Sequence, residues 1–262
     1  MNKNLEEKIR VENIKISRAE ASFYDVIHGE IFNQYEQARF KRDIDLIALF
    51  VRGTPRFALD IGCGTGNLFL KFLKHGFHVV GVDISKEMID ILRDKLENRA
   101  NLMDIHCLEI DKFLQEEKRK YDVVSISSVL HHLPNWYKTL EIVCDRISKK
   151  GILYVTHEPT LEIRNHYNPI HKFLHYIEYG LNRLYIGIKL YGKKLPLLDY
   201  SYSDYHAKKG IDQYKIRNLL YRKGFKILRY EEYYCGKNMW FAIMNNLLRC
   251  SKAQFSLIAR AK

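Results

Sequence analysis

The sequence predicts an α/β fold, in which a doubly wound, mostly parallel seven-stranded sheet carries helices on both faces. Short apolar runs of strand length alternate with amphipathic segments of helix length along most of the chain. Neither an internal repeat nor a low-complexity linker interrupts this alternation. A strand–helix–strand crossover returns the chain in its original direction, so the alternation predicts parallel pairing within a single domain.

The elements follow one another in a clear order. Residues 1–52 are expected to be helical, because apolar positions recur there at spacings of three and four. The strand candidates are the apolar runs 57–61, 78–84, 104–110, 121–129, 152–158, 225–234 and 254–261. Helices are expected at 67–76, 85–98, 135–151 and 212–224, with Ser85 as an N-cap and with Gly76 and Gly151 as helix ends. Residues 160–207 break the alternation and predict an insertion of irregular helices.

Composition narrows the class of protein. The 262 residues are 47% hydrophobic, which is enough for a sizeable core, and no apolar run reaches the roughly 20 residues that a membrane-spanning helix needs. The first residues lack the apolar region of a secretory signal. The five cysteines form no Cys-x-x-Cys pair, which argues against a zinc site and a disulfide framework. We therefore expect the cytoplasm as the compartment.

The net charge of +12 favours anionic partners, such as nucleic acid, a membrane surface or an acidic metabolite. However, no block of five or more basic residues occurs. Dispersed lysines are typical of an ordinary solvated surface. The charge alone therefore does not choose a partner.

The stretch LDIGCGTGN, residues 59–67, joins a predicted strand to a predicted helix. Ligands of open parallel sheets bind at such strand ends, where the strand order reverses. Gly62, Gly64 and Gly66 are spaced G-x-G-x-G, which differs from the G-x-G-x-x-G of dinucleotide sites. Asp60 precedes them, and a carboxylate about 4 Å from a phosphate costs on the order of 4 kcal/mol. A ligand with ammonium and sulfonium charges and no phosphate suits this loop better.

Three segments carry a family resemblance. LDIGCGTGN, VGVDIS and YDVVSISSVLHHLP, in this order and spacing, resemble the class I S-adenosylmethionine-dependent methyltransferases, in particular the subgroup acting on quinones, sterols and other small molecules. The likeness covers residues 20–160 well and the carboxyl-terminal part more loosely. It implies a Rossmann-like methyltransferase fold and S-adenosylmethionine as cofactor. It also implies a helical lid at 1–52 containing Phe23, Tyr24 and Tyr35, a cofactor-binding core at 53–159, an acceptor-side insertion at 160–210 and a final sheet part at 211–262.

The resemblance also implies roles for single residues. Asp60 would face the methionine amino group, and Asp83 would bind the ribose hydroxyls as an acceptor. Glu109, with Asp111 as the alternative, would contact the adenine amino group; otherwise both only begin a helix, whose dipole favours carboxylates. The expected cofactor-binding residues are Tyr24, Asp60, Gly62, Cys63, Gly64, Gly66, Asn67, Asp83, Ile84, Glu109, Ile110, Asp111 and Ser127.

Methyl transfer to a hydroxyl requires alignment, exclusion of water and removal of a proton. The segment SVLHHLPN lacks the Asn/Asp-Pro-Pro-Tyr-like tetrapeptide of methyltransferases that act on the amino groups of adenine bases or glutamine. O-methylation of a small molecule is therefore favoured. The catalytic candidates are His131, His132, His157 and Glu158, although the HHLP histidines can instead only shape their loop. No metal-ligand spacing is apparent among them, so we expect metal-independent transfer.

The insertion would supply contacts to the acceptor. The candidates are Tyr167, His171, His175, Tyr202, Tyr205 and His206, and the alternative is that these side chains form a small core of the insertion itself. Three functions compete. The first is O-methylation of a glycan, natural-product or metabolite precursor. The second is methylation of a lipid-linked or quinone-type acceptor at a membrane surface, from the apolar stretches 184–192 and 238–248 and the basic charge. The third and least favoured is RNA methylation or RNA binding, from the abundance of tyrosine. The oligomeric state stays open.

Overall fold

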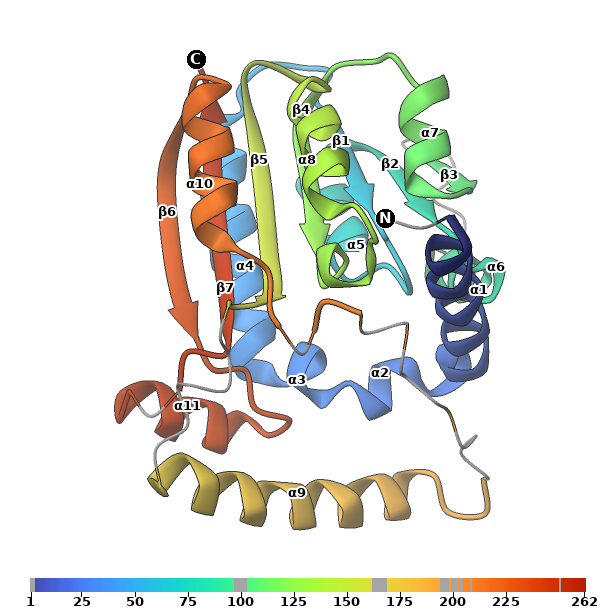
Figure 1. Ribbon diagram of the computed structural model, residues 1–262, viewed down its shortest axis with the longest axis vertical. Helices are drawn as coiled ribbons and strands as arrows, with labels where there is room; N and C mark the ends of the chain where they lie inside the picture. The colour runs from blue at the N-terminus through green and yellow to red at the C-terminus, as the bar shows by residue number, and fades with distance from the viewer. Residues whose placement is uncertain are drawn as a thin grey trace.

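The computed structural model describes residues 3–96, 103–161, 169–193, 198, 202, 205–207, 209–249 and 251–262. In this part of the chain a seven-stranded sheet has the order β3-β2-β1-β4-β5-β7-β6 (Figure 1). Its strands are β1 (Phe57–Ile61), β2 (His78–Asp83), β3 (Met103–Cys107), β4 (Tyr121–Ser127), β5 (Ile147–Pro159), β6 (Phe225–Tyr233) and β7 (Gln254–Ala261). Only β7 runs antiparallel to its neighbours among these strands. The predicted doubly wound, mostly parallel fold is confirmed.

Helices cover both faces of the sheet, as Figure 1 shows. One face carries α4 (Gln34–Phe50), α5 (Asn67–Lys74) and α6 (Lys86–Leu96), and the other carries α7 (Ile110–Glu116), α8 (Trp136–Cys144) and α10 (Gln213–Arg222). Side chains of a strand alternate between the two faces. In β1, Leu59 and Ile61 therefore join the core under α7 and α8, whereas Ala58 joins the core under α4 and α5.

The chain between α8 and β5 corrects one prediction. The helix expected at 135–151 ends at Cys144, and Ile147–Lys150 already belong to β5. Ile147 pairs with Tyr121 of β4, and the Ser148 hydroxyl donates to the Tyr121 carbonyl at 2.9 Å. Gly151 thus lies inside the strand rather than at a helix end. The Ser85 cap is confirmed, because the Met88 amide donates to its hydroxyl at 3.3 Å.

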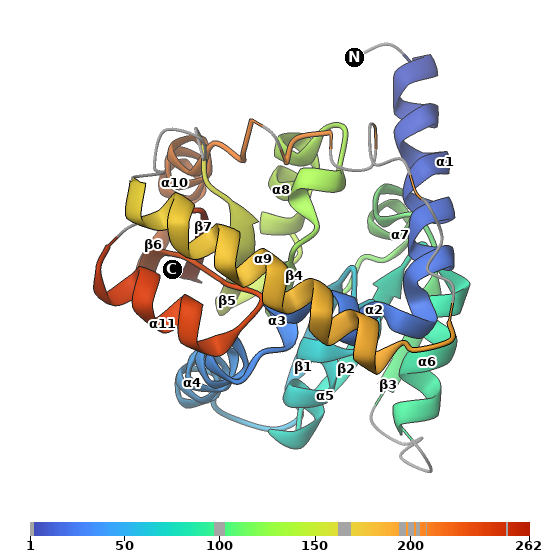
Figure 2. The same ribbon diagram turned by 90° about the horizontal axis from the view of Figure 1, so that it is seen from below.

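Several helices lie at the edge of the sheet where the parallel strands end. The amino-terminal segment forms α1 (Lys3–Glu20), η1 (Ala21–Phe23), α2 (Tyr24–Ile27) and α3 (Gly29–Phe32) before α4, as the helical prediction for 1–52 required. Beyond the same edge lie α9 (Pro169–Lys189) and α11 (Met239–Leu247), side by side (Figures 1 and 2). The helix α11 was not predicted; its sequence was noted only as an apolar stretch.

A buried charge cluster fastens α4 to the carboxyl-terminal half of the sheet. The Arg39 guanidinium donates to Glu36 at 2.9 and 2.5 Å, to the Thr156 hydroxyl of β5 at 2.8 Å and to Asp43 at 3.3 Å. Tyr233 of β6 donates to Glu36 at 3.1 Å. Burial raises the pKa of Glu36, but Arg39 and a neighbouring histidine outweigh it and hold the pKa at about 2. The buried ionic groups of this cluster therefore take their hydrogen bonds from one another and not from water.

Removal of the central cation should destabilise the protein strongly. Arg39→Met leaves Glu36 and Asp43 as buried carboxylates without their main partner, so we expect a loss of roughly 3–5 kcal/mol in the free energy of unfolding. Arg42→Met is the matched control. Arg42 is half-exposed and pairs with Asp43 from the solvent side, so its loss should cost about 1 kcal/mol or less. Urea unfolding followed by circular dichroism measures both, and equal losses would contradict the assignment.

Candidate active site

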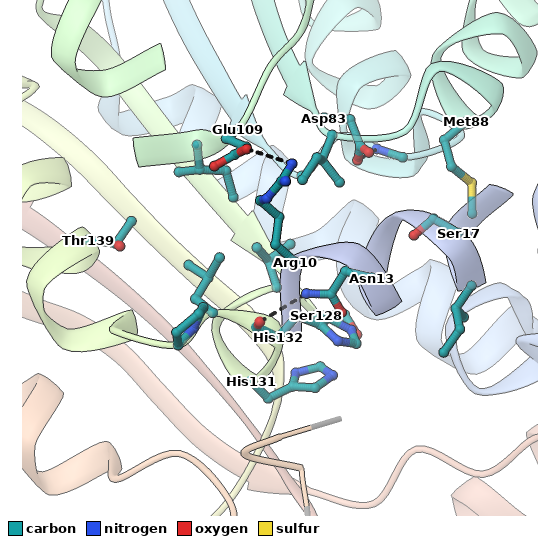
Figure 3. A pocket seen from close by; sticks show the side chains of 18 of the residues that line it. Arg10, Asn13, Ser17, Asp83, Met88, Glu109, Ser128, His131, His132 and Thr139 are labelled. Carbon is teal, nitrogen blue, oxygen red and sulfur yellow. Dashed lines mark hydrogen bonds and ion pairs between the residues drawn. The ribbon is translucent and has the colours of Figure 1, made fainter. Parts of the chain in front are cut away.

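A cavity of about 740 Å³ lies at the ends of β1, β2 and β4, where the strand order reverses. Its walls come from α1, α2 and α3 and from the loops that follow the strands (Figure 3). Most drug-sized and cofactor-sized ligands occupy cavities of about 300–1,000 Å³. The cavity therefore has the size and the position of a ligand site in an open α/β sheet.

The glycine loop forms the floor of this cavity. Gly62 and Gly64 line it with φ angles of +68° and +50°. A Cβ on Gly62 would lie 2.3 Å from Val129, whereas one on Gly64 would meet no atom within 4 Å. The Gly64 backbone is thus open to a ligand. Gly66 lies outside the cavity, and a Cβ there would lie 2.4 Å from Leu92, so the third glycine allows α6 to pack closely.

Asp83 presents an oriented carboxylate at the end of β2. Its Oδ2 accepts the Gly64 amide at 2.8 Å, and its Oδ1 accepts the Ser85 amide at 2.9 Å. Burial raises the pKa of the carboxyl, and the two amides oppose this shift. The neighbouring Ile84 lines the cavity as well. Asp83 is therefore held in one position with lone pairs left for a ligand.

Asp60 lies in a smaller adjoining pocket that Tyr24, Cys63, Asn67 and Ser127 also line. Its side chain is almost fully buried and accepts the Ser125 hydroxyl at 2.6 Å. Burial raises the pKa of Asp60 to about 7. Within the described residues no lysine, arginine or histidine forms an ion pair with it. A buried carboxylate without a cationic partner favours the binding of a ligand that carries positive charge.

The far wall joins the loop after β3 to α1. Glu109, Ile110 and Asp111 all line the cavity; Glu109 pairs with Arg10 at 3.1 Å, and Asp111 accepts the Thr139 hydroxyl at 2.8 Å. Glu109 is also the residue before α7, without a side-chain cap bond. Asn13 donates to the His132 carbonyl at 3.2 Å, as the second dashed line in Figure 3 shows. Two contacts thus hold α1 against the cavity wall.

The amino-terminal helices contribute three ionisable side chains that the sequence did not single out. His28 lies 3.1 Å from Glu20 and 2.8 Å from Glu30, and all three line the cavity. Burial lowers the pKa of His28, but the two carboxylates outweigh it and raise the pKa to about 9. The Tyr24 ring lies 4.2 Å from the His28 ring. No local motif marks these residues; only their place in the predicted lid pointed to this wall.

His131 and Glu158 form a buried pair between β4 and β5. Glu158 accepts the Val129 amide at 2.7 Å, the Leu130 amide at 2.8 Å and the His131 amide at 3.3 Å. Its Oε2 also lies 2.9 Å from His131 Nδ1. Ser128 before this turn has a φ of +57°, which costs a non-glycine residue free energy. His131 and His132 line the cavity, whereas Glu158 stands behind His131.

The remaining expected residues lie elsewhere. His157 is outside the cavity and binds Glu36 in the buried charge cluster, with Nδ1 3.0 Å from Oε1. His171 and His175 of α9 lie near α11 and β6: His171 bonds Asn245 at 2.7 Å, and the Tyr234 hydroxyl lies 3.5 Å from His175.

The later insertion residues divide into three cases. His206 lies behind the cavity wall, where its amide donates to the His131 carbonyl at 3.1 Å. Tyr202 contacts α1 through Glu12, and Tyr205 stacks edge-on against His206; neither lines the cavity. Tyr167 falls outside the described residues. Of the lid aromatics, Phe23 and Tyr35 do not line the cavity, whereas Tyr24 does.

Comparison with known proteins decides the family. The model of a methyltransferase domain matches residues 32–191, more than half of the chain. The protein belongs to the methyltransferase domain family. A ubiquinone biosynthesis O-methyltransferase of Coxiella burnetii is 28% identical over 99 residues, which span 38% of this chain and 42% of the relative. A demethylmenaquinone methyltransferase of Leptospira interrogans is 26% identical over 182 residues, 68% of this chain and 70% of the relative.

A solved structure supports the fold of this methyltransferase. The magnesium protoporphyrin IX methyltransferase from Synechocystis PCC 6803 with bound S-adenosylmethionine superposes with a TM-score of 0.55 at 17% identity, covering 95% of this chain and 97% of that one. S-adenosylmethionine, which that structure binds, is the cofactor expected for this methyltransferase. The cavity fits it, because Asp60 is a buried carboxylate beside an open glycine backbone and the cofactor carries two positive charges. Within the described residues, no group of three histidine, cysteine, aspartate or glutamate side chains is arranged to hold a metal ion.

The raised pKa of Asp60 should make cofactor binding depend on pH. The Asp60 carboxyl has a pKa of about 7, so at lower pH it is neutral and attracts no cation. Affinity for S-adenosylmethionine should therefore rise roughly tenfold from about pH 5.5 to about pH 7. Calorimetry on the wild type and Asp60→Asn measures this change in affinity, and the variant should lose most of the rise.

The same raised pKa should affect stability. The Asp60 carboxyl holds its proton more tightly in the folded than in the unfolded protein, so protonation stabilises the ligand-free fold at low pH, and this stabilisation is lost as the pH rises through about 7. Asp60→Asn should therefore gain thermal stability relative to the wild type at pH 8. An identical pH profile in both proteins would contradict the role of Asp60.

Proposed function

We propose that this methyltransferase O-methylates a small molecule whose hydroxyl group binds beside His131. The observation that carries the proposal is the His131–Glu158 pair in the cavity wall. S-adenosylmethionine supplies an electrophilic methyl group on a sulfonium centre. The remaining task is to hold the acceptor hydroxyl in line with that group and to remove its proton.

The proton acceptor follows from the tautomer that Glu158 selects. The Glu158 oxygens already accept hydrogen bonds from three backbone amides, and Oε2 also accepts one from His131 when Nδ1 carries the ring proton. Nε2 is then the atom that carries a lone pair. It can accept the hydroxyl proton, and the buried Glu158 carboxylate stabilises the imidazolium that forms. In this proposal His131 is the general base and Glu158 positions it.

Opposite this base, the acidic end of the cavity would hold the cofactor. In Figure 3 Asp83 and His131 lie on opposite sides of the pocket, with Arg10 and Asn13 of α1 between them. Asp83 would accept the ribose hydroxyls, and Asp60 would attract the amino group. Glu109 would contact the adenine, which requires that its ion pair with Arg10 rearranges or is shared. Such an arrangement leaves the His131 side for the acceptor.

The histidine pair gives a test of the base. We expect His131→Asn and Glu158→Gln each to lower kcat roughly a hundredfold to ten-thousandfold, because Nε2 no longer accepts the proton. His132→Asn is the matched control and should retain most of the activity. Affinity for S-adenosylhomocysteine and the circular dichroism spectrum should stay unchanged in all three. The kcat–pH profile of the wild type should lose its acid limb in His131→Asn; loss of activity in His132→Asn alone would reverse the assignment.

Asp83 gives a test of the cofactor end. Asp83→Asn removes a charged acceptor, which should weaken S-adenosylmethionine binding by about 1.5–3 kcal/mol, or roughly tenfold to a hundredfold. Asp90→Asn is the control and should bind normally, because the Asp90 side chain lies on the solvent side of α6 and outside the cavity. Isothermal titration calorimetry measures both. Wild-type affinity in Asp83→Asn would remove Asp83 from the site.

A second candidate function is methylation of a quinone-type or lipid-linked acceptor. The names of the two curated relatives favour it, because one is a ubiquinone biosynthesis and the other a demethylmenaquinone enzyme. The discriminating assay offers labelled S-adenosylmethionine with two sets of acceptors, namely water-soluble phenols and catechols, and quinols with isoprenoid tails in detergent. Turnover of the tailed quinols alone would favour the second candidate. Turnover of the soluble set alone would favour the first.

A further inference from the structure

The helix α9 has an inward face that packs against the protein and an apolar stripe that faces outward. The inward face contains His171, Leu174 and Glu178, which are buried against α11 and the segment after β6. The outward stripe repeats at spacings of three and four, as a buried helix face does. All of its members are exposed: Ile170, Phe173, Ile177, Leu181, Leu184 and Ile188. An exposed apolar stripe of this kind is typical of an interaction surface.

The neighbouring α11 extends this surface. Trp240 and Leu247 are 65% and 78% exposed, and Met244 between them is also exposed. Figure 2 shows α9 and α11 side by side across the end of the molecule at which the strands terminate. The cavity opens at the same end of the sheet, with α2 between it and α9. The apolar surface therefore lies near the acceptor side of the site.

The charges on this surface have one sign. Within residues 169–193 and 236–249 the cationic side chains are Lys172, Arg183, Lys189, Lys193, Lys237 and Arg249, and Glu178 is the only acid. Of these cations, Lys237 pairs with Glu30 of α3 at 2.9 Å. Glu178 is buried, where it accepts the Tyr234 hydroxyl and the Asn238 amide at 2.9 Å each. Solvent therefore meets apolar and cationic groups here. Tyrosines and a tryptophan, which favour the interface between lipid and water, stand among them, with Tyr176 the most exposed tyrosine of the helix α9.

We propose that α9 and α11 form a docking surface for an anionic phospholipid bilayer. Helices that lie in a membrane interface combine an apolar face with lysine and arginine, and anionic lipids attract such segments. None of the described helices is long and apolar enough to cross a membrane, so α9 would lie along the surface. A second copy of the chain is a poorer occupant, because a two-fold interface would bring this cationic face against itself.

This surface goes beyond the proposed function and does not depend on it. The outward residues of α9 lie outside the cavity, so cofactor binding and lipid binding can be measured separately. With the docking surface on the bilayer, an acceptor that resides in the bilayer would reach the nearby cavity without crossing water.

Vesicle flotation tests the proposal. Purified full-length protein should float with vesicles of phosphatidylcholine and phosphatidylglycerol at physiological salt, and much less with phosphatidylcholine alone. Leu184→Glu/Ile188→Glu places two charges on the outward stripe and should lower the bound fraction at least tenfold. Leu49→Glu/Tyr221→Glu is the matched control, because both residues are at least as exposed but lie on α4 and α10. Affinity for S-adenosylhomocysteine should stay unchanged in both double variants.

The two tryptophans supply a second, independent readout. Trp136 is 9% exposed, whereas Trp240 lies on the proposed surface, so only Trp240 should respond to lipid. Anionic vesicles should shift the fluorescence to shorter wavelength in the wild type. Trp240→Phe should lose the shift but still float, because phenylalanine remains apolar.

Three results would overturn the proposal. The first is no flotation with anionic vesicles, and the second is equal flotation of the two double variants. The third is a stable dimer in sedimentation that Leu184→Glu/Ile188→Glu disperses, since a second copy would then occupy the surface. Normal cofactor affinity beside any of these results would leave the proposed methyl transfer intact.

Discussion

One buried carboxylate organises the reactive side of the cavity. Glu158 is the penultimate residue of β5 and is fully buried, where a charged group is tolerated only when hydrogen bonds replace water. The amides of the turn after β4 and the His131 ring provide these bonds. The β4–β5 pairing ends at Thr156, and Glu158 itself pairs with Phe255 of β7. These pairings set the place of Glu158, and its hydrogen bonds in turn fix the turn after β4 and the His131 imidazole. The position of His131 thus follows from the sheet, although the residue itself lies outside any strand.

The opposite side of the cavity is organised by acidic side chains. Asp60 is buried and Asp83 is partly buried, and loss of solvent raises the pKa of each. Glu20 and Glu30 add negative charge from the lid, partly balanced by His28. A cationic ligand would reduce the electrostatic repulsion among these carboxylates, whereas a phosphate would increase it. The electrostatic argument from Asp60 in the sequence and the family of the chain therefore agree on S-adenosylmethionine.

The sequence predicted most of the fold because its signals are local. The seven strands and the Ser85 cap depend on short patterns, and residues such as Asp83 and Gly64 occupy motif positions that stay fixed relative to their strand. Predictions failed or stopped where a distant partner decides the outcome. The helix at 135–151 ends early because β4 recruits Ile147 into the sheet. Thr156 and His157 both contact the α4 cluster, whereas the adjacent Glu158 contacts the β4 turn. A β-bulge between Val155 and Glu158, with His157 at a φ of +56°, interrupts the alternation of the strand here. Gly66 and the lid residue His28 depend on packing between helices, which no local pattern encodes.

The Arg39 cluster has a consequence for the order in which the protein forms. Arg39 and Asp43 lie in the first fifth of the chain, but Tyr233 lies on β6 and Ser256, 3.5 Å from Asp43, lies on β7. These partners are synthesised well after α4, and β7 must insert between β5 and β6 before the cluster is complete. Until then, the ionic groups of α4 lack part of their partners while the central strands assemble. Contacts between segments so distant in the sequence form slowly, and we therefore expect completion of the Arg39 cluster to be a late step of folding.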